Sequence, residues 1–262
     1  MAVAPGTGWP GDVATATTPV AESDADVSRL ADTSPTMEEL TARVSVCRAC
    51  PRLVNWREEV ARTGRASYAG QTYWGRPITG FGPSDARVAI VGLAPAAHGG
   101  NRTGRVFTGD RSGDWLFAAL HRAGLARLPI SVSADDGQEL TDTRMIAAVR
   151  CAPPANAPTP AERDTCRPWM ERELMLLGDN LRVVVALGGF AWGTLWPVLT
   201  AVGHEMPRPR AKFGHLAEVR TADGLLVIGS FHPSQQNTFT GRLTEPMLDA
   251  VFARVNAELA EI

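Results

Sequence analysis

Two segments that each follow a predicted strand carry side chains able to do chemistry on a bound ligand. The first, GLAPAAHGGNRTGRVFTGD, holds an imidazole, a phenyl ring and a carboxylate: His98, Phe107 and Asp110. The second, FHPSQQNTFTGRLT, places His232 directly after its strand. Because ligands of parallel sheets bind at the carboxyl ends of the strands, we expect both segments to line one crevice. The first segment has no serine or cysteine in a nucleophile setting, and it lacks the lysine of a phosphate-binding P-loop.

The four cysteines form a C-x2-C pair, Cys47 and Cys50, and a wider pair, Cys151 and Cys166. A C-x2-C spacing lets two thiolates bind one metal centre. One site that uses all four thiolates would account for every cysteine. Zinc and an iron–sulfur cluster both suit four thiolates, and the wide second pair suits the larger cluster. Buried structural thiols and two disulfides are the alternatives. The start of the chain lacks the basic and apolar segments of an export signal, which weakens the disulfide alternative.

Strands and helices alternate along most of the chain. Continuous runs of Val, Ile and Leu predict strands at 87–93, 143–151, 181–188 and 224–233. Helices are predicted at 36–46, 53–62, 112–124, 159–178, 189–199 and 244–262. This alternation favours an α/β fold with a parallel sheet covered on both faces.

The composition is that of a globular chain of 262 residues, with 44% apolar residues and a formal net charge of −2. No apolar run approaches the length of about 20 residues that a membrane span needs. Residues 1–35 contain five acidic residues and one arginine and lack apolar periodicity, so we expect a disordered acidic tail. Residues 36–262 are then one domain. Of the 26 basic residues all but Lys212 are arginine, which suits bidentate contacts to phosphate.

Taken in order, the motifs resemble the uracil-DNA glycosylase superfamily, specifically its iron–sulfur branch and most closely family 5, the B-type enzymes. The matching segments are C-x2-C at 47–50, GLAPAAHGGNRTGRVFTGD at 92–110, RCAPPANAPTPAE at 150–162, ALGGFAW at 186–192 and FHPSQQNTFTGRLT at 231–244. The resemblance implies a three-layer α/β/α sandwich with a central four-stranded parallel sheet. It also implies hydrolysis of the N-glycosidic bond of a damaged base flipped out of DNA, which leaves an abasic site.

The resemblance implies catalytic roles for three residues. Asp110 would act on the sugar side with Asn156 as its polar assistant, and His232 would hydrogen-bond a carbonyl oxygen of the departing base. From the residues alone, Asp110 equally suits an N-cap, and Asn156 suits a turn between prolines. In many members a polar residue of the first motif positions the water, but here that place holds Leu93 or Ala94. We therefore expect Asp110 to take over this task.

Other residues match parts of the family's substrate pocket. Small residues would let the backbone approach the sugar and the base edge, Phe107 would stack on the flipped base, and His98 would contact the sugar or the base. Related enzymes read uracil with an Asn where this chain has Ala147, so we expect relaxed specificity that includes hypoxanthine and xanthine. The substrate-binding residues predicted in this way are Gly92, Ala94, Pro95, His98, Phe107 and Ala147.

The last motif would form a loop that wedges into the minor groove and supports base flipping. The predicted DNA-binding residues are Ser234, Gln235, Asn237 and Arg242 in this loop, and Arg102 and Arg105 near the first motif. Arg111 could also neutralise the DNA backbone. Each arginine taken singly equally suits a solvated surface charge.

The resemblance further implies a structural [4Fe-4S] cluster on Cys47, Cys50, Cys151 and Cys166. The expected partner is double-stranded and also single-stranded DNA that contains deaminated bases, bound by a monomer in the cytoplasm of a prokaryotic cell. A non-catalytic iron–sulfur protein that binds damaged DNA is the alternative, and Asp110 and His232 count against it. A nucleotide-binding module is disfavoured because GLAPAAHGG matches no phosphate-binding motif. A covalently trapped relative is disfavoured because the loop after Phe107 has no basic insertion.

Overall fold

The computed structural model describes residues 2–261, which contain one five-stranded sheet with the strand order β2-β1-β3-β5-β4. The strands are β1 (Val88–Gly92), β2 (Thr143–Ala147), β3 (Val183–Leu187), β4 (Glu218–Arg220) and β5 (Leu226–Ser230). The first four in the sheet order run parallel, as predicted, and β4 adds an antiparallel edge strand that the sequence patterns did not indicate. With only three residues, two of them exposed, β4 lacks the apolar run that marks the other strands.

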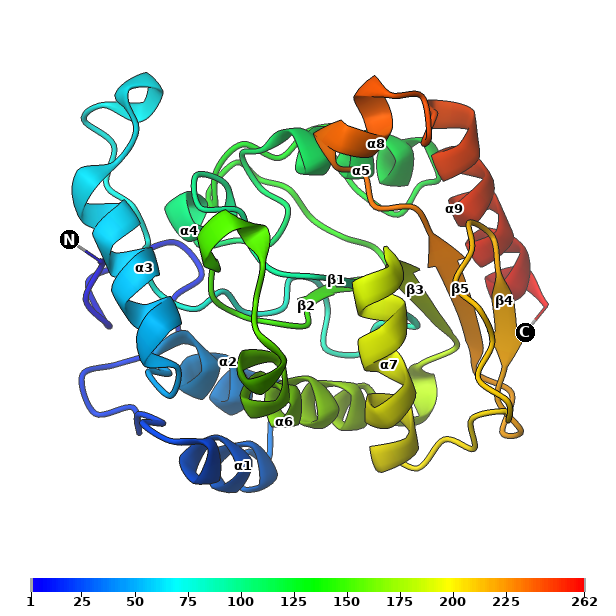
Figure 1. Cartoon of the computed structure of the whole chain (residues 1–262), viewed down its shortest axis with the longest axis horizontal. Coiled ribbons are helices and arrows are strands. Elements are labelled where there is room, and N and C mark those ends of the chain that lie inside the picture. Colours follow the sequence, from blue (N-terminus) through cyan, green and yellow to red (C-terminus); the bar gives the residue numbers. More distant parts are fainter. Residues whose placement is uncertain (1, 262) are drawn as a thin grey trace.

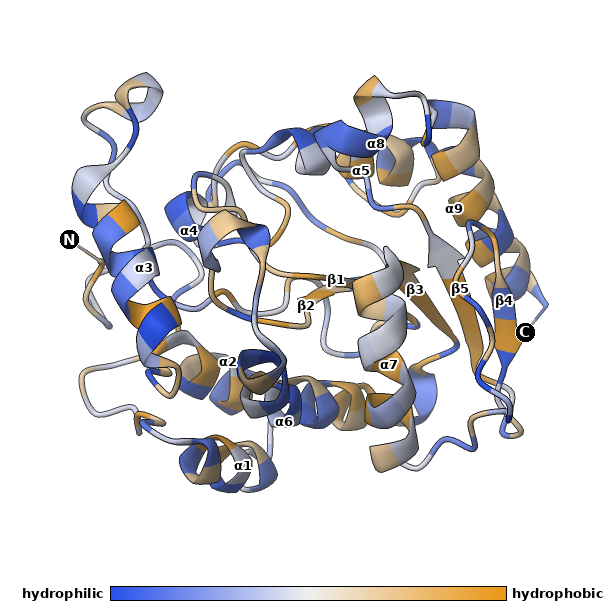
Figure 2. Cartoon of the chain, in the orientation of Figure 1, coloured by the Kyte–Doolittle hydropathy of each residue, from blue (hydrophilic) through white to orange (hydrophobic). Residues whose placement is uncertain are grey.

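Helices cover both faces of the sheet and complete the three predicted layers (Figure 1). Val88 and Ile90 of β1 pack with α5 (Arg111–Arg122) and α9 (Glu245–Ala260) on one face. Ala89 and Val91 pack with α6 (Pro160–Leu177) and α7 (Gly189–Ala201) on the other. Figure 2 shows these strands in hydrophobic colours, as expected for strands buried on both faces. In the described part of the chain, no helix is both long and apolar enough to cross a membrane.

The remaining helices frame the two motifs and the cysteines. They are α1 (Asp24–Asp32), α2 (Met37–Ser45), α3 (Pro51–Thr63), α4 (Gly100–Thr103), α8 (Gln235–Phe239) and the 3-10 turns η1 (Ala66–Tyr68), η2 (Pro154–Asn156) and η3 (Gly178–Asn180). Helix starts follow the sequence closely, since Thr36 caps α2 and Thr159 with Glu162 forms a capping box on α6. The six long helices predicted from the sequence are therefore present to within a few residues.

The segment expected to be a disordered tail is folded onto the domain in the structure. Ser23 is the N-cap of helix α1 and accepts a hydrogen bond from the Asp26 N–H, and α1 packs against α6. Val27 and Leu30 of this helix are buried. Farther toward the N-terminus, Asp12 forms an ion pair with the buried Arg76 at 2.7 Å. For α1 the physical reason is that a few apolar side chains at helical spacing can bury one face even where the average composition is polar.

Candidate active site

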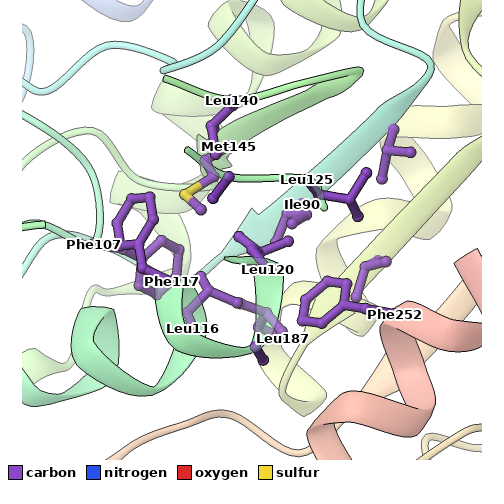
Figure 3. Close-up of a cluster of buried hydrophobic side chains, with 14 of the residues drawn as sticks. Ile90, Phe107, Leu116, Phe117, Leu120, Leu125, Leu140, Met145, Leu187 and Phe252 are labelled. Carbon is purple, nitrogen blue, oxygen red and sulfur yellow. The ribbon is translucent and has the colours of Figure 1, made fainter. Parts of the chain in front are cut away.

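The phenyl ring of Phe107 lies against the end of β1, where Gly92 makes room for the ring, and Gly113 makes room for the Phe107 backbone. A Cβ on Gly92 would lie 2.6 Å from the ring, and a Cβ on Gly113 would lie 1.8 Å from the Phe107 carbonyl oxygen. Phe107 adopts a φ of 52°, which is uncommon for a bulky residue. The ring belongs to the same buried cluster as Phe117 (Figure 3). Gly92 was expected to admit the sugar, but in the structure it admits the phenyl ring.

His232 follows β5 and comes next to Phe107, so the structure brings the two predicted segments together. The ring centroids of His232 and Phe107 are 6.1 Å apart, with 38° between the ring planes. The Asn237 side chain donates to the His232 carbonyl oxygen at 2.9 Å and fixes the turn after the strand. Burial lowers the pKa of His232 to about 4. The imidazole is therefore neutral at pH 7 and can donate a hydrogen bond without being an acid.

Asp110 is the N-cap of α5, which is one of the two roles that the sequence predicted for it. One carboxylate oxygen, Oδ1, accepts a hydrogen bond from the Gly113 N–H at 3.0 Å. The other oxygen, Oδ2, lies so close over Gly99 that a Cβ there would be 2.1 Å away. Desolvation raises the pKa of Asp110 above its ordinary value. One oxygen thus caps the helix, and the second remains directed toward the turn after β1.

Asn156 lies in η2, between the cysteine segment and α6. It is exposed, and it and Ala155 have φ angles of 55° and 53°. Left-handed backbone at two consecutive residues is costly, and such strain concentrates at functional sites. Within residues 2–261 the Asn156 side chain makes no hydrogen bond with the protein, so its amide is available to a ligand.

The remaining predicted pocket residues lie around the ends of β1 and β2. Ala147 is buried and pairs in register with Gly92, so it belongs to the same edge of the sheet. Ala94 packs beside the cysteine segment, and Pro95 packs against Gly100. These three positions are close to the motif residues, and their role in substrate binding stays a prediction.

His98 has a hydrogen-bond partner, Tyr73, that no sequence pattern indicated. Its Nδ1 atom lies 3.0 Å from the Tyr73 hydroxyl, and the Tyr73 ring meets the imidazole edge-on. Desolvation, together with the positive charge of Arg65 and Arg102, lowers the pKa of His98. The tyrosine lies 25 residues earlier in an irregular segment, where no local pattern ties it to this histidine.

The expectation that Arg102 and Arg105 bind DNA is corrected by the structure. Arg105 is buried, forms an ion pair with Asp136 at 2.5 Å and donates to Ser131. Arg102 is buried as well and donates to the carbonyl oxygens of His98 and Gly109. Arg102 thus holds the 93–110 loop together by satisfying its buried carbonyl groups. Arg105 ties the same loop to residues 131–136. Neither is free to meet a phosphate.

The loop after β5 contributes an exposed surface to this edge. Helix α8, mostly hydrophilic in Figure 2, exposes Gln235, whereas Asn237 is directed inward to His232. Phe239 was not singled out from the sequence, yet its side chain is 70% exposed. The guanidinium of Arg111 lies 5.8 Å from the Phe239 ring. The sequence signal for Phe239 was an aromatic residue inside the polar run QQNTF.

Two further members of this loop lie at its ends. Ser234 is the N-cap residue of α8, without a side-chain capping bond. Arg242 is exposed, and its guanidinium lies 4.7 Å from the Phe231 ring. Both remain accessible from the side of α8, where a nucleic acid could approach.

The four cysteines, from three separate segments, line one small cavity together with Arg57, Arg150 and Trp169. Cys151 and Cys166 are buried, and Cys47 and Cys50 are partly buried. Burial raises the pKa of the Cys47 thiol to about 11 and that of Cys50 to about 12, so the free thiols stay protonated at neutral pH. Among residues 2–261, no three His, Cys, Asp or Glu side chains lie close enough to hold a single metal ion.

The surroundings of this cavity fit an anionic group larger than one ion. Four buried nitrogen donors of residues that border it lack a hydrogen-bond partner in the described protein: Arg57 Nε, Arg150 Nε, Arg150 Nη1 and Trp169 Nε1. Buried donors are normally paired, and thiolate or sulfide sulfur in the cavity would accept from them. Four sulfur ligands spread around a common space suit a four-iron cluster better than a tetrahedral zinc ion.

Comparison with known proteins identifies the family of this chain. The family described as Uracil DNA glycosylase superfamily matches residues 79–260. A protein from Mycobacterium bovis, named type-5 uracil-DNA glycosylase, is 57% identical over 250 residues, covering 95% of this chain and 92% of its own length. Proteins with the same name from Thermus thermophilus and Pyrobaculum aerophilum are 48% and 44% identical, over 80% and 89% of this chain and 92% and 98% of their own lengths. The chain belongs to the uracil-DNA glycosylase superfamily, and these relatives place it in the type-5 branch.

Proposed function

We propose that this protein removes uracil from DNA by hydrolysing the N-glycosidic bond. The observation that carries the proposal is the meeting of Phe107 and His232 at the end of β1, with the Asp110 carboxylate in the same loop. The names of the type-5 relatives support the same reaction. A flipped base would stack on the Phe107 ring, since an enzyme acting on a base must take it out of the duplex.

The proposed reaction creates a negative charge on the base and a positive charge on the sugar, and the site has a residue suited to each. As the bond between the sugar C1′ and the base nitrogen breaks, its electron pair leaves with the base. The neutral His232 would donate a hydrogen bond to the base oxygen on which negative charge develops. The Asp110 carboxylate would stabilise the sugar cation and accept a proton from the water that adds to C1′. Asn156 would orient that water.

We expect the pocket to accept other deaminated bases. Ala147 offers a methyl group at the edge of the sheet, so no buried amide would be left unpaired by hypoxanthine or xanthine. The test is incubation of the protein with duplexes that contain uracil, hypoxanthine or xanthine, followed by alkali. Strand breaks at uracil and at one other deaminated base are expected. Breaks at uracil alone would refute the relaxed specificity, and no breaks at any base would refute the glycosylase.

The exposed Phe239 would act as a wedge between base pairs. An apolar side chain inserted into a base step helps to kink the duplex, and Arg111 beside it would meet the phosphate. We expect Phe239→Ala to lower activity on duplex DNA by about tenfold, because base flipping costs a few kcal/mol there. Activity on single-stranded DNA should change much less. Ile130→Ala, which removes another exposed apolar side chain, is the control; equal losses on both substrates would contradict the wedge.

The cavity of the four cysteines would hold a [4Fe-4S] cluster whose role is structural. Leu53, Val149 and Cys151 pack with Ala94 of the first motif, and Cys151 shortly precedes Asn156. An ordered cluster would therefore fix two parts of the proposed site. Iron and acid-labile sulfide should co-purify in about equal amounts with the wild-type protein. Cys166→Ser is expected to lose most of the iron and to lower the melting temperature, and zinc without iron would contradict the proposal.

A further inference from the structure

Arg57 occupies an unusual place between a groove and the cysteine cavity. It lies on α3, and only 1% of its surface is exposed. On one side it lines the cavity of the four cysteines. On the other it lines a groove of about 830 Å³ between α3 and the N-terminal segment. In the described part of the chain, Arg57 alone borders both spaces.

The guanidinium of Arg57 is directed at sulfur rather than at a carboxylate. Its Nη1 atom lies 2.9 Å from Cys151 Sγ, and Nη2 donates to the Cys47 carbonyl oxygen at 3.1 Å. Within residues 2–261, Glu58 is the one carboxylate that reaches it, at 4.0 Å, and Glu58 also pairs with Arg48. The Nε–H of Arg57 has no partner there.

A buried cation in this setting needs a negative charge nearby. An unpaired buried guanidinium is costly, so buried charges are paired or serve a bound group. Arg150, the other arginine at the cavity, already pairs with Glu173 at 2.5 Å. Among residues 2–261 the Cys151 sulfur is closer to the guanidinium than the shared Glu58 carboxylate is, and sulfur supplies a counter-charge when it is ionised.

We propose that Arg57 balances the negative charge of the four-cysteine cluster and closes its cavity against the groove. The proposal rests on the cluster proposed above. Hydrogen bonds and positive charge at ligand sulfur favour the reduced, more negative state, so they raise the reduction potential. The flat guanidinium would also keep water and oxidants in the groove away from the cluster. Arg57 is thus a positioning and protecting residue, outside the reacting atoms.

The test compares three variants of the full chain purified without oxygen. Arg57→Met keeps most of the side-chain volume but removes the charge and the donors. Arg57→Lys keeps the charge without the planar fork. Arg62→Met is the control, because Arg62 lines the same groove but is exposed and pairs with Glu59. The readouts are iron and sulfide per chain, the rate of iron loss to EDTA in air, and the reduction potential.

We expect Arg57→Met to lose iron at least about tenfold faster than the wild type, the size of effect usual for outer partners of a metal site, and to have a lower potential. Arg62→Met should match the wild type. Iron loss and potential unchanged in Arg57→Met would overturn the inference. If Arg57→Met does not fold, faster iron loss from Arg57→Lys supports the inference and an unchanged rate overturns it. A wild type that binds no iron would instead refute the proposed cluster.

Discussion

Replacing Asp110 by Asn is expected to slow release of the base by about 100- to 10,000-fold, the range typical of a lost general base. The choice of Asn matters, because Asn caps helices about as well as Asp. The hydrogen bond to the Gly113 N–H can therefore persist, while the carboxylate charge that we propose acts on the sugar disappears. The measurement is single-turnover release of uracil from a duplex, together with the melting temperature of each protein.

Asp114→Asn is the matched control, since it removes another carboxylate from the first turn of the same helix. It should retain nearly the wild-type rate. Full activity of Asp110→Asn with an unchanged melting temperature would mean that Asp110 only caps the helix. Because burial raises the pKa of Asp110, the rate should also fall at a higher pH than for an ordinary carboxylate as the solution is acidified.

Removing the imidazole in His232→Ala is expected to reduce the rate by about 100- to 1,000-fold, as when a donor to a developing anion is lost. The loss should appear in kcat rather than in KM, because the hydrogen bond strengthens only as the base becomes an anion. His204→Ala removes a partly exposed histidine that pairs with Asp223 and is the control. A loss confined to KM would mean that His232 merely binds the base.

The same substitution should alter the acid stability of the protein. The pKa of His232 is about 4 in the folded chain and about 6.5 when unfolded. Between these values the unfolded chain binds more protons, so this histidine lowers stability as the pH falls from 6.5 toward 4. The His232→Ala protein should lose less stability over that window. The pKa values of His98 and His215 are lowered as well. Part of the loss of stability at acid pH would therefore remain in the variant.

The sequence predicted the meeting of Phe107 and His232 well, because both follow buried strands whose carboxyl ends share one edge. The glycines that make room there were harder to interpret. Gly99 and Gly113 touch Asp110 and Phe107 through close approaches that depend on the folded loop. No spacing rule reveals such contacts.

Buried arginines account for most of the remaining differences between the sequence-based predictions and the structure. Arg105 looks like a surface charge in sequence, and its ion pair with Asp136 spans 31 residues. The order of the N-terminal segment likewise depends on long-range contacts, such as that between Asp12 and Arg76. A signal for α1 was nevertheless present, since Ser23 precedes apolar residues at helical spacing.

The most direct test of the proposed site is a crystal structure of the Asp110→Asn protein bound to a duplex that contains uracil. We expect a flipped uracil stacked on Phe107, with the His232 imidazole at a uracil oxygen and residue 110 beside the sugar C1′. A uracil that remains in the duplex stack, or one bound away from the ends of β1 and β5, would contradict the account.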